Sequence, residues 1–449
     1  MTDLVFHGGV NEIGGNKILV RDRDVALFFD FGHSFTNGNH FFVNWLRPRR
    51  VYGVRDYFEF NLLPPIKGLY RDEYLAHTSL SYTTPEFQGV FLSHAHFDHV
   101  GHLRFLDPRI PIYCGSCTRL FMESQEESTP STFGLHEYRT FRTGNTFTLD
   151  PVHIEPIHVD HSIPGAYGFL IHTSHGTIVY TGDLRAHGPK HDMTQEFIER
   201  AIACDPIALI TEGTRMLNMD PRTNYSEAEV KQRCQTIISA TEKMVFVTHY
   251  GRDMDRFRTM YEVTQAAGRQ LVISTRLAYL LFTLRRDKQL DLPNPLTDDT
   301  ILIYYRRKHT GTYAETDYYL WERGFMDKLV TGQYVHDHQS TLVMDLGFYQ
   351  FGELIDIQPQ PGSHFIHSMS EPFSEEDIED QVMRNWLQHF GIIFHQLHAS
   401  GHLNRQELTD MITQIRPNQV FPIHTEQPQL FQTLPYPVTI VQKGSMYHL

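Results

Sequence analysis

The sequence predicts a layered α/β fold that carries polar groups at the ends of its strands. Short apolar runs, rich in branched and aromatic residues, recur along the chain and are followed by glycine or a turn, as buried strands are. Other stretches combine a helix-capping residue with an apolar stripe at helical spacing. In layered α/β proteins, ligands gather just beyond the carboxyl ends of the strands.

Length and composition are those of an ordered globular protein. The 449 residues can bury a large core and predict two domains, and 41% are hydrophobic. No apolar run reaches the roughly 18 residues of a membrane span, and the first residues do not resemble a signal peptide. Because the chain has only four cysteines, no disulfide framework is expected, and we expect a reducing, cytoplasmic location without membrane contact.

The net charge of −14 argues mildly against a protein that grips nucleic acid without specificity. Basic residues nevertheless cluster at 47–50, 284–288 and 304–309. Each cluster is either a contact for nucleic acid or an ordinary solvated face.

In the first half of the chain, four apolar runs end on a group that can bind metal or move a proton. They are "VALFFD", "GVFLSH", "TIVYTGD" and "IALITE", and they end at Asp30, His94, Asp183 and Glu212. Since parallel strands in such folds share one carboxyl edge, these groups are expected to line one site.

The middle of the chain, from about residue 214, predicts a second α/β unit. A capping box of Ser226 and Glu229 begins a helix over 226–240. Strands are predicted over 243–250 and 269–274, on either side of a helix over 255–268, and the Pro- and Asp-rich stretch 291–300 predicts a loop.

Near the end of the chain, Asn404 and Glu407 form another capping box before a helix that Pro417 closes. Its apolar stripe consists of Leu408, Met411, Ile412 and Ile415. A short strand then leads to His424.

The strongest motif is H-x-H-x-D-H in "FLSHAHFDHVG". It consists of His94, His96, Asp98 and His99. Imidazole and carboxylate groups suit zinc or manganese. A turn after a strand can point the first two histidines at one ion and the Asp–His pair at a second. Two ions about 3.5–4 Å apart can hold a bridging hydroxide and flank an in-line displacement. A His-rich loop without metal is the alternative.

This motif resembles the second signature of the metallo-β-lactamase superfamily. "LFFDFG" resembles the first signature and supplies Asp30, which in that family supports the metal-binding loop without binding metal. "VDHSIPGAYGF" resembles the third and supplies His161, and "YTGD" resembles the fourth and supplies Asp183, which bridges the ions. His158 is an alternative candidate for this ligand. We prefer His161, because His161 directly precedes "SIPGAYGF".

The resemblance implies two divalent metal ions, with zinc favoured and manganese as the alternative. One ion is expected to bind His94, His96, His161 and Asp183. The other is expected to bind Asp98, His99, Asp183 and His424.

"LITEGT", "HASGH" and "FPIHTE" resemble motifs A, B and C of the β-CASP nucleases, and the chain is especially similar to ribonuclease J. These motifs supply Glu212, His402 and His424. The resemblance implies a metallo-β-lactamase αββα sandwich over 1–213 and 391–449, with an inserted α/β β-CASP domain over 214–390. A histidine at motif C is associated in that family with RNA substrates.

The stretch "HASGH" just before the helix at Asn404 offers an anion site. Ser400, Gly401 and His402 lie where free N–H groups and the helix dipole favour a phosphate, with His398 as an added donor. Glu212 is expected to pair with His402 and keep an imidazolium that stabilises or protonates the departing oxygen. The alternatives are a helix-capping role for Glu212 and a core position for His398.

These motifs predict a metal-dependent ribonuclease that acts on single-stranded RNA, from the 5′ end, internally or both. The expected catalytic groups are Asp98, Asp183, Glu212 and His402. The alternatives are a DNA nuclease of the same architecture, a small-molecule metallo-hydrolase and a non-catalytic RNA-binding protein. Ribonuclease J has a further C-terminal domain that supports dimerisation and that we do not find here, so an oligomer is possible but unsupported.

Weaker signals remain open. Cys114 and Cys117 have the C-x-x-C spacing of redox or zinc sites, but no second pair accompanies them. The segment 33–80 is rich in aromatic and basic residues that either stack bases or pack against the core. The glycine-rich stretch 8–16 is interpreted as structural. The arginines at 252, 256 and 276 either meet RNA backbone or form surface pairs.

Overall fold

Two sheets packed face to face form the upper part of the protein. The computed structural model describes residues 2–43, 45–220, 222–371 and 377–449. The first sheet has the order β20-β1-β2-β3-β4-β5-β6. Its strands are β20 (Met446–His448), β1 (Thr2–Gly8), β2 (Lys17–Asp22), β3 (Val25–Phe29), β4 (Gly89–Leu92), β5 (Ile112–Gly115) and β6 (Tyr138–Phe141).

The second sheet has the order β19-β11-β10-β9-β8-β7. Its strands are β19 (Val420–Ile423), β11 (Ala208–Glu212), β10 (Gly176–Tyr180), β9 (Tyr167–Thr173), β8 (Val152–His158) and β7 (Phe147–Leu149). Aromatic side chains fill the space between the sheets: Phe6 stacks on Phe421, and Phe29 meets Phe169 edge-on.

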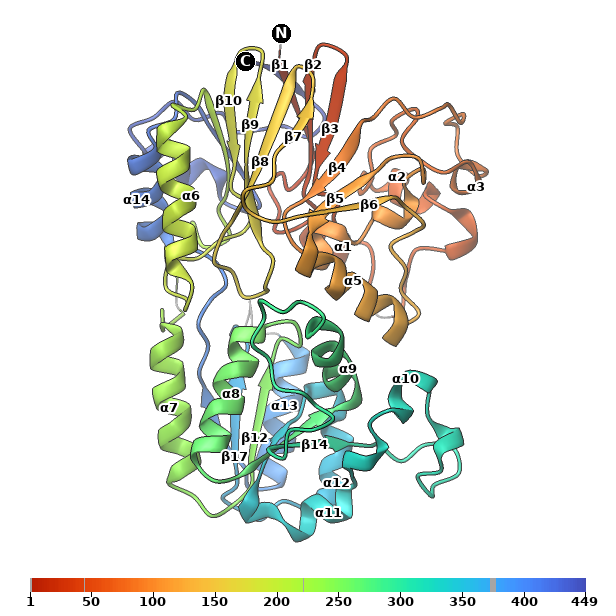
Figure 1. The fold of residues 1–449 in the computed structure, drawn as a ribbon, viewed down its shortest axis with the longest axis vertical. Helices are drawn as coiled ribbons and strands as arrows, with labels where there is room; N and C mark the ends of the chain where they lie inside the picture. Colours follow the sequence, from red (N-terminus) through yellow and green to blue (C-terminus); the bar gives the residue numbers. More distant parts are fainter. Residues whose placement is uncertain (1, 44, 221, 372–376) are drawn as a thin grey trace.

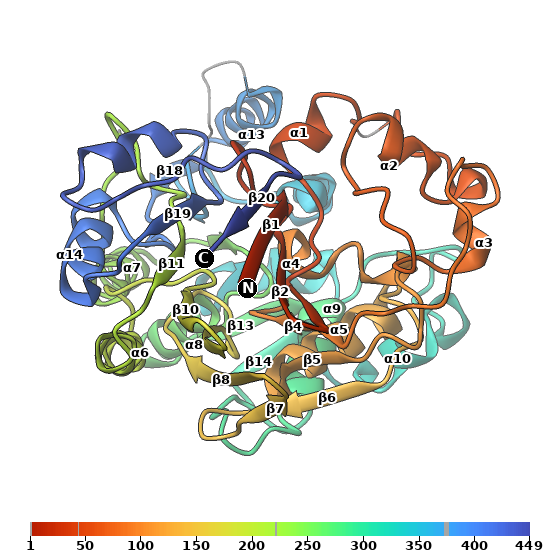
Figure 2. The same ribbon diagram turned by 90° about the horizontal axis from the view of Figure 1, so that it is seen from above.

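Helices cover both outer faces of this pair of sheets, as Figure 1 shows. On one side lie α6 (His191–Ala203) and α14 (Arg405–Ile415). On the other lie α1 (Thr36–Asn39), α2 (Arg55–Glu59), α3 (Asp72–Leu75), α4 (Phe97–Val100) and α5 (Ser116–Ser128). The expected αββα sandwich is confirmed. Seen from above, the chain ends lie side by side where β20 pairs with β1 (Figure 2).

A third sheet, in which all neighbouring strands are parallel, forms the lower part of the protein, with the order β15-β14-β13-β16-β12-β17-β18. Its strands are β15 (Leu329–Val330), β14 (Ile301–Tyr304), β13 (Gln270–Ser274), β16 (Leu342–Asp345), β12 (Val245–His249), β17 (His364–Ser368) and β18 (Ile393–Gln396). Its helices are α7 (Glu227–Ser239), α8 (Met254–Ala266), α9 (Thr275–Leu284), α10 (Leu320–Arg323), α11 (Gly332–Asp337), α12 (Leu354–Ile357) and α13 (Ile378–His389).

The boundary expected at residue 391 differs from the strand pairing. β18 pairs in parallel with β17, Phe394 opposite Phe365, so residues 393–396 complete the third sheet rather than return to the sandwich. Hydrogen bonds along a strand edge decide which sheet these residues join. An apolar run in the sequence does not by itself reveal its partner strand. The chain then rejoins the sandwich through α14 and β19, which pairs with β11.

Local signals placed the helix ends well. Both predicted capping boxes, Ser226 with Glu229 and Asn404 with Glu407, are present. α14 buries the predicted stripe and ends at Ile415, because the next residue, Arg416, has a φ of 55° that breaks the helix just before Pro417. Within the described part of the chain, no helix has the length and apolar character needed to cross a membrane.

Candidate metal centre

The ends of six strands bring the predicted site residues to one edge of the sandwich, facing the inserted unit. Asp30 follows β3, the H-x-H-x-D-H turn follows β4, and Asp183 follows β10. Glu212 ends β11, His424 follows β19, and His161 follows β8. Among the described residues, three groups of these side chains lie close enough to hold a cation.

The first group is a trio of imidazoles. Nδ1 of His96 lies 2.9 Å from Nε2 of His94 and 3.3 Å from Nε2 of His161. Nδ1 of His161 donates to the carbonyl of Gly401 at 2.6 Å, so that Nε2 carries the free lone pair. Burial lowers the pKa of His96 to about 4 and the pKa values of His94 and His161 well below their usual range, and the three rings are therefore neutral, as metal ligands must be.

The second group combines two carboxylates with two imidazoles. Nε2 of His424 lies 3.0 Å from Oδ2 of Asp98 and 3.7 Å from Oδ2 of Asp183. Nε2 of His99 lies 3.2 Å from the same Asp183 oxygen. Burial opposes the charged ring of His424, but Asp183 and Asp98 outweigh it and raise its pKa to about 9. Without a cation, a proton therefore balances the two buried carboxylates.

Two buried atoms in this group have no hydrogen-bond partner, Nε2 of His99 and Oδ1 of Asp183. A buried polar atom without a partner is costly, and at a metal centre the cation is the partner. Imidazole nitrogen and carboxylate oxygen are ligands that zinc and manganese accept. The residues present fit a metal centre.

Asp30 supports this centre from behind. Its carboxylate accepts hydrogen bonds from the backbone N–H of Ser93 at 2.7 Å, the Ser93 hydroxyl at 2.8 Å and the Tyr180 hydroxyl at 2.6 Å. Nδ1 of His99 lies 2.8 Å from it, which turns Nε2 toward the site. Asp30 has a φ of 58°, an uncommon conformation that these contacts hold in place.

The glycine-rich stretch 8–16 braces the same turn, in agreement with its structural interpretation. The N–H of Asn16 donates to the carbonyl of Asp98 at 3.1 Å, and the N–H of His424 donates to the carbonyl of Gly9 at 2.7 Å. A methyl group on Gly32 would lie 1.5 Å from the carbonyl oxygen of Asp98. Glycine is therefore required at position 32, where these loops meet.

The third group is a carboxylate–imidazole pair beside Asp183. Nδ1 of His402 lies 2.9 Å from both carboxylate oxygens of Glu212 and 3.9 Å from Oδ2 of Asp183. Glu212 also accepts from the N–H groups of Leu184, at 3.1 Å, and Thr214, at 3.2 Å. The expected pairing of Glu212 and His402 is present, and Glu212 is held by backbone as well.

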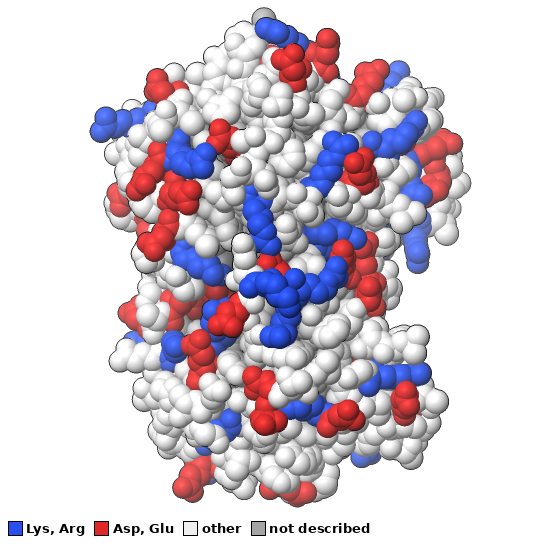
Figure 3. Space-filling view, in the orientation of Figure 1, with Lys and Arg blue, Asp and Glu red and all other residues white. Residues whose placement is uncertain are grey.

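All three groups open into one cleft of about 490 Å³ between the sandwich and the inserted unit. The inserted unit contributes Tyr250, Arg252 and Ser370 to its walls. The guanidinium of Arg252 lies 4.5 Å from the ring centroid of Phe97 and donates to the carbonyl of Ala95. In Figure 3, Lys and Arg side chains gather near mid-height, where the two units meet.

Comparisons with known proteins agree with this geometry. Residues 65–250 match the β-lactamase superfamily domain, and residues 393–432 match the Zn-dependent metallo-hydrolase RNA specificity domain. A crystal structure of a protein of unknown function from Enterococcus faecalis V583 shares the fold, with a TM-score of 0.78 at 24% identity over the full length of both chains.

Among curated relatives, the chain is 23% identical over 438 residues to ribonuclease J 2 of Streptococcus pyogenes, covering 95% of this chain and 70% of that protein. It is 25% identical over 358 residues to ribonuclease J of Sinorhizobium meliloti, covering 76% of this chain and 58% of that protein. Over most of its length the chain therefore resembles the β-CASP ribonuclease J proteins. It spans between about half and 70% of the length of the ribonuclease J relatives it matches.

The phosphate site expected at the start of α14 in this ribonuclease J-like chain needs correction. The capping box already uses the N–H groups of Asn404 and Glu407, so the helix terminus offers fewer free donors than expected. Ser400, Gly401 and His402 do line the cleft.

His398 also lines the cleft, but its expected donor role does not fit. Nδ1 lies 3.2 Å from the carbonyl of Ser368, which only accepts, so Nδ1 carries the proton. Burial lowers the pKa of His398 to about 3. The ring is therefore neutral, and Nε2 is an acceptor.

The three arginines whose roles the sequence left open lie in different surroundings in this ribonuclease J-like fold. Only Arg252 lines the cleft, and Arg276 is exposed outside it. Arg256 is fully buried and bonded to Glu227, so neither of the two roles left open for it, RNA contact or surface pair, is present.

The structure also decides two other questions from the sequence, the role of His158 and that of the C-x-x-C pair. His158 stacks on Tyr167 at 4.9 Å and joins none of the three groups, in contrast to His161. Cys114 and Cys117 are buried, which raises the pKa of each thiol to about 12, and no metal-binding group in the described part of the chain includes them. They pack in hydrophobic cores.

The sequence did not predict a buried ionic network that joins the two units. Arg185, two residues after Asp183, is fully buried. It contacts Asp160 at 3.0 Å in the sandwich, and Glu227 at 2.9 Å and Asp255 at 2.7 Å in the inserted unit. Its partners lie up to 70 residues away, and no local pattern pairs them.

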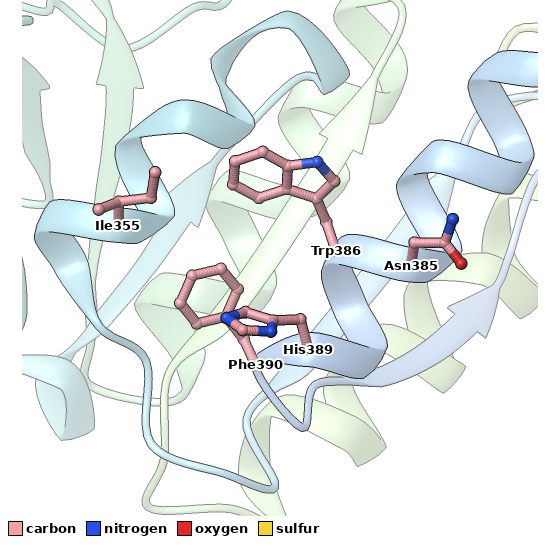
Figure 4. Close-up of a pocket in the computed structure, with 5 residues that line it drawn as sticks. All are labelled: Ile355, Asn385, Trp386, His389 and Phe390. Carbon is pink, nitrogen blue, oxygen red and sulfur yellow. The ribbon is translucent and has the colours of Figure 1, made fainter.

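A separate pocket of about 310 Å³ lies on the inserted unit between α12 and α13 (Figure 4). It is lined by Ile355, Asn385, Trp386, His389 and Phe390. This lining offers a single imidazole and no carboxylate, so it lacks the convergent ligands of the cleft.

Proposed function

We propose that this chain is a metal-dependent ribonuclease that hydrolyses phosphodiester bonds of single-stranded RNA in the cleft between its two units. The observation that carries this proposal is the convergence of seven candidate metal ligands and the Glu212–His402 pair beside one cleft, which six of these residues line. Its relatives are ribonuclease J proteins, and the region that matches an RNA specificity domain contains both His402 and His424.

We assign the imidazole trio together with Asp183 to one divalent cation, and the Asp98, His99, Asp183 and His424 group to a second. Zinc is the first choice, as the Zn-dependent family description supports, and manganese is the alternative. Bound there, the two cations would neutralise phosphate charge and lower the pKa of water.

The chain's own residues then act on the leaving side of the reaction. Glu212 orients the ring of His402, which lies at the cleft wall 3.9 Å from Asp183. From this position, His402 donates a proton or a hydrogen bond to the departing oxygen. Tyr250 and Arg252 of the inserted unit hold the RNA strand from the opposite wall.

The experiment compares RNA and DNA oligonucleotides of matched sequence, labelled at either end. We expect the zinc-loaded protein to cleave RNA, chelation to stop cleavage, and His96→Ala to remove it. The product lengths separate 5′-terminal from internal cleavage. Cleavage that survives both chelation and His96→Ala contradicts the proposal. If the protein cleaves DNA in preference to RNA, DNA is the substrate instead.

We also place this activity in a reducing compartment such as the cytoplasm. The four cysteines of the chain are all free. Free, mostly buried thiols are typical of such compartments.

A further inference from the structure

A second cavity, of about 320 Å³, lies beside the cleft and is lined mainly by rings. Its walls include Phe35, Tyr57, Phe97 and Phe133 together with His33 and His102. These residues come from three segments separated in sequence, one of which is the aromatic stretch within 33–80.

The cavity adjoins the cleft, because Phe35 and Phe97 line both. Phe97 lies between His96 and Asp98 in the H-x-H-x-D-H turn. The rings of Phe35 and Phe97 remain 40% and 36% exposed. A group in the cavity therefore lies next to any phosphate bound in the cleft.

The rings are arranged around the cavity at several angles. Phe133 lies 6.2 Å from Phe97 with an interplanar angle of 30°, and His33 meets Phe35 edge-on at 5.9 Å. Gly101 makes this possible, since a methyl group there would lie 2.9 Å from Cβ of His33. Flat apolar walls of this kind favour a flat aromatic guest.

The polar groups of the cavity suit an uncharged guest. Nδ1 of His33 lies 3.1 Å from Nε2 of His102, while Nδ1 of the buried His102 has no partner. Burial lowers the pKa of His33 to about 4 and the pKa of His102 well below its usual value, so both rings are neutral near pH 7. Arg104 supplies one cation, which already lies over the ring of Phe105. A phosphate needs more positive charge than this, whereas a nucleobase needs ring faces and a few hydrogen bonds.

We propose that this cavity binds one nucleobase of the RNA strand, that of a nucleotide adjacent to the scissile phosphate. The proposal rests on the ribonuclease function proposed above. Stacking on an aromatic side chain is worth about 1–3 kcal/mol per base, which is on the order of tenfold in affinity or more.

The first test uses the unaltered protein. RNA oligonucleotides carry a single abasic nucleotide at successive positions around the cleavage site. We expect kcat/KM of the zinc-loaded protein to fall about tenfold at one position next to the scissile bond and little elsewhere. Equal cleavage of every abasic substrate would overturn the proposal and leave the ribonuclease function intact.

The second test does not depend on cleavage. RNA with 2-aminopurine at that position is bound to the chelated protein, and stacking quenches its fluorescence. Phe35→Leu, which removes a flat ring and keeps apolar volume, should abolish the quenching. Phe282→Leu on α9 is the matched control, because Phe282 is 46% exposed and lines neither cavity.

The outcomes separate the two proposals. Quenching that Phe35→Leu removes, without any cleavage, supports the base site and contradicts the ribonuclease. RNA that binds without quenching at any position overturns the base site. A protein that neither binds nor cleaves RNA contradicts both.

Discussion

Nδ1 of His402 lies 2.9 Å from each of the two carboxylate oxygens of Glu212. The carboxylate cannot turn away, because the N–H groups of Leu184 and Thr214 also hold it. The imidazole therefore keeps one orientation beside Asp183 at the wall of the cleft.

If His402 donates to the departing oxygen, His402→Ala should lower kcat by about 10²–10⁴-fold while KM and zinc content change little. Glu212→Gln keeps the shape of the pair but loses its charge, and we expect a smaller loss of kcat. Single-turnover cleavage of end-labelled RNA measures both. His389→Ala, in the pocket of Figure 4, is the control. A His402→Ala protein with normal kcat excludes the assigned role.

Asp30 offers a test of how the metal centre is supported. Asp30→Asn keeps the shape but removes the charge that three hydrogen-bond donors and His99 share, so His99 is held less firmly. We expect zinc affinity to fall about 10–100-fold, measured by competition with a chromophoric chelator. Asp24→Asn, an exposed carboxylate in the turn before β3, should bind zinc normally. Unchanged affinity in Asp30→Asn contradicts the supporting role.

Metal removal should also lower the stability of the fold. A cation that binds the native centre and not the unfolded chain stabilises the protein by mass action, by about 2.7 kcal/mol at a hundredfold excess over Kd. Chelation should therefore lower Tm, and added zinc should restore it. His96→Ala should weaken the response to zinc. A Tm that ignores both chelator and zinc means that the centre holds no stabilising metal.

The buried network around Arg185 predicts a large effect far from any RNA contact. Arg185→Met leaves Asp160, Glu227 and Asp255 without a shared partner at the junction of the two units. Removing one member of a buried ion pair costs about 3–5 kcal/mol. The exposed pair of Arg384 and Asp380 should cost at most about 1 kcal/mol when Arg384 is changed to Met. Urea denaturation measures both, and equal losses would contradict a central role for Arg185.

Local sequence signals predicted the parts of this protein that are built locally. The H-x-H-x-D-H turn, the capping boxes at Ser226 and Asn404, and the apolar stripe of α14 depend on residues a few positions apart. The order of the superfamily signatures then extended the site to His161 and Asp183, whose positions no local spacing fixes.

Features that depend on distant pairing were missed or misplaced. Arg252 reaches Ala95 and the cleft across 157 positions, and the contacts of Arg185 join separate units. The partner of β18 is decided by the free edge of β17, which cannot be read from residues 393–396 alone. The capping box at Asn404 was predicted, but its competition with a phosphate for the same N–H groups became evident only from the hydrogen bonds.

Gly32 provides the sharpest test of how the loops fix the metal-binding turn. A methyl group there would lie 1.5 Å from the carbonyl oxygen of Asp98, which already accepts from the N–H of Asn16. Backbone atoms on both sides must move, so Gly32→Ala should cost at least about 3 kcal/mol and weaken zinc binding. Gly324→Ala, with an ordinary φ of −59° and open space around it, should change stability by only about 0.5 kcal/mol. Urea denaturation and zinc titration of the two variants decide the matter: if Gly32→Ala keeps both stability and zinc affinity, the turn does not depend on this close approach.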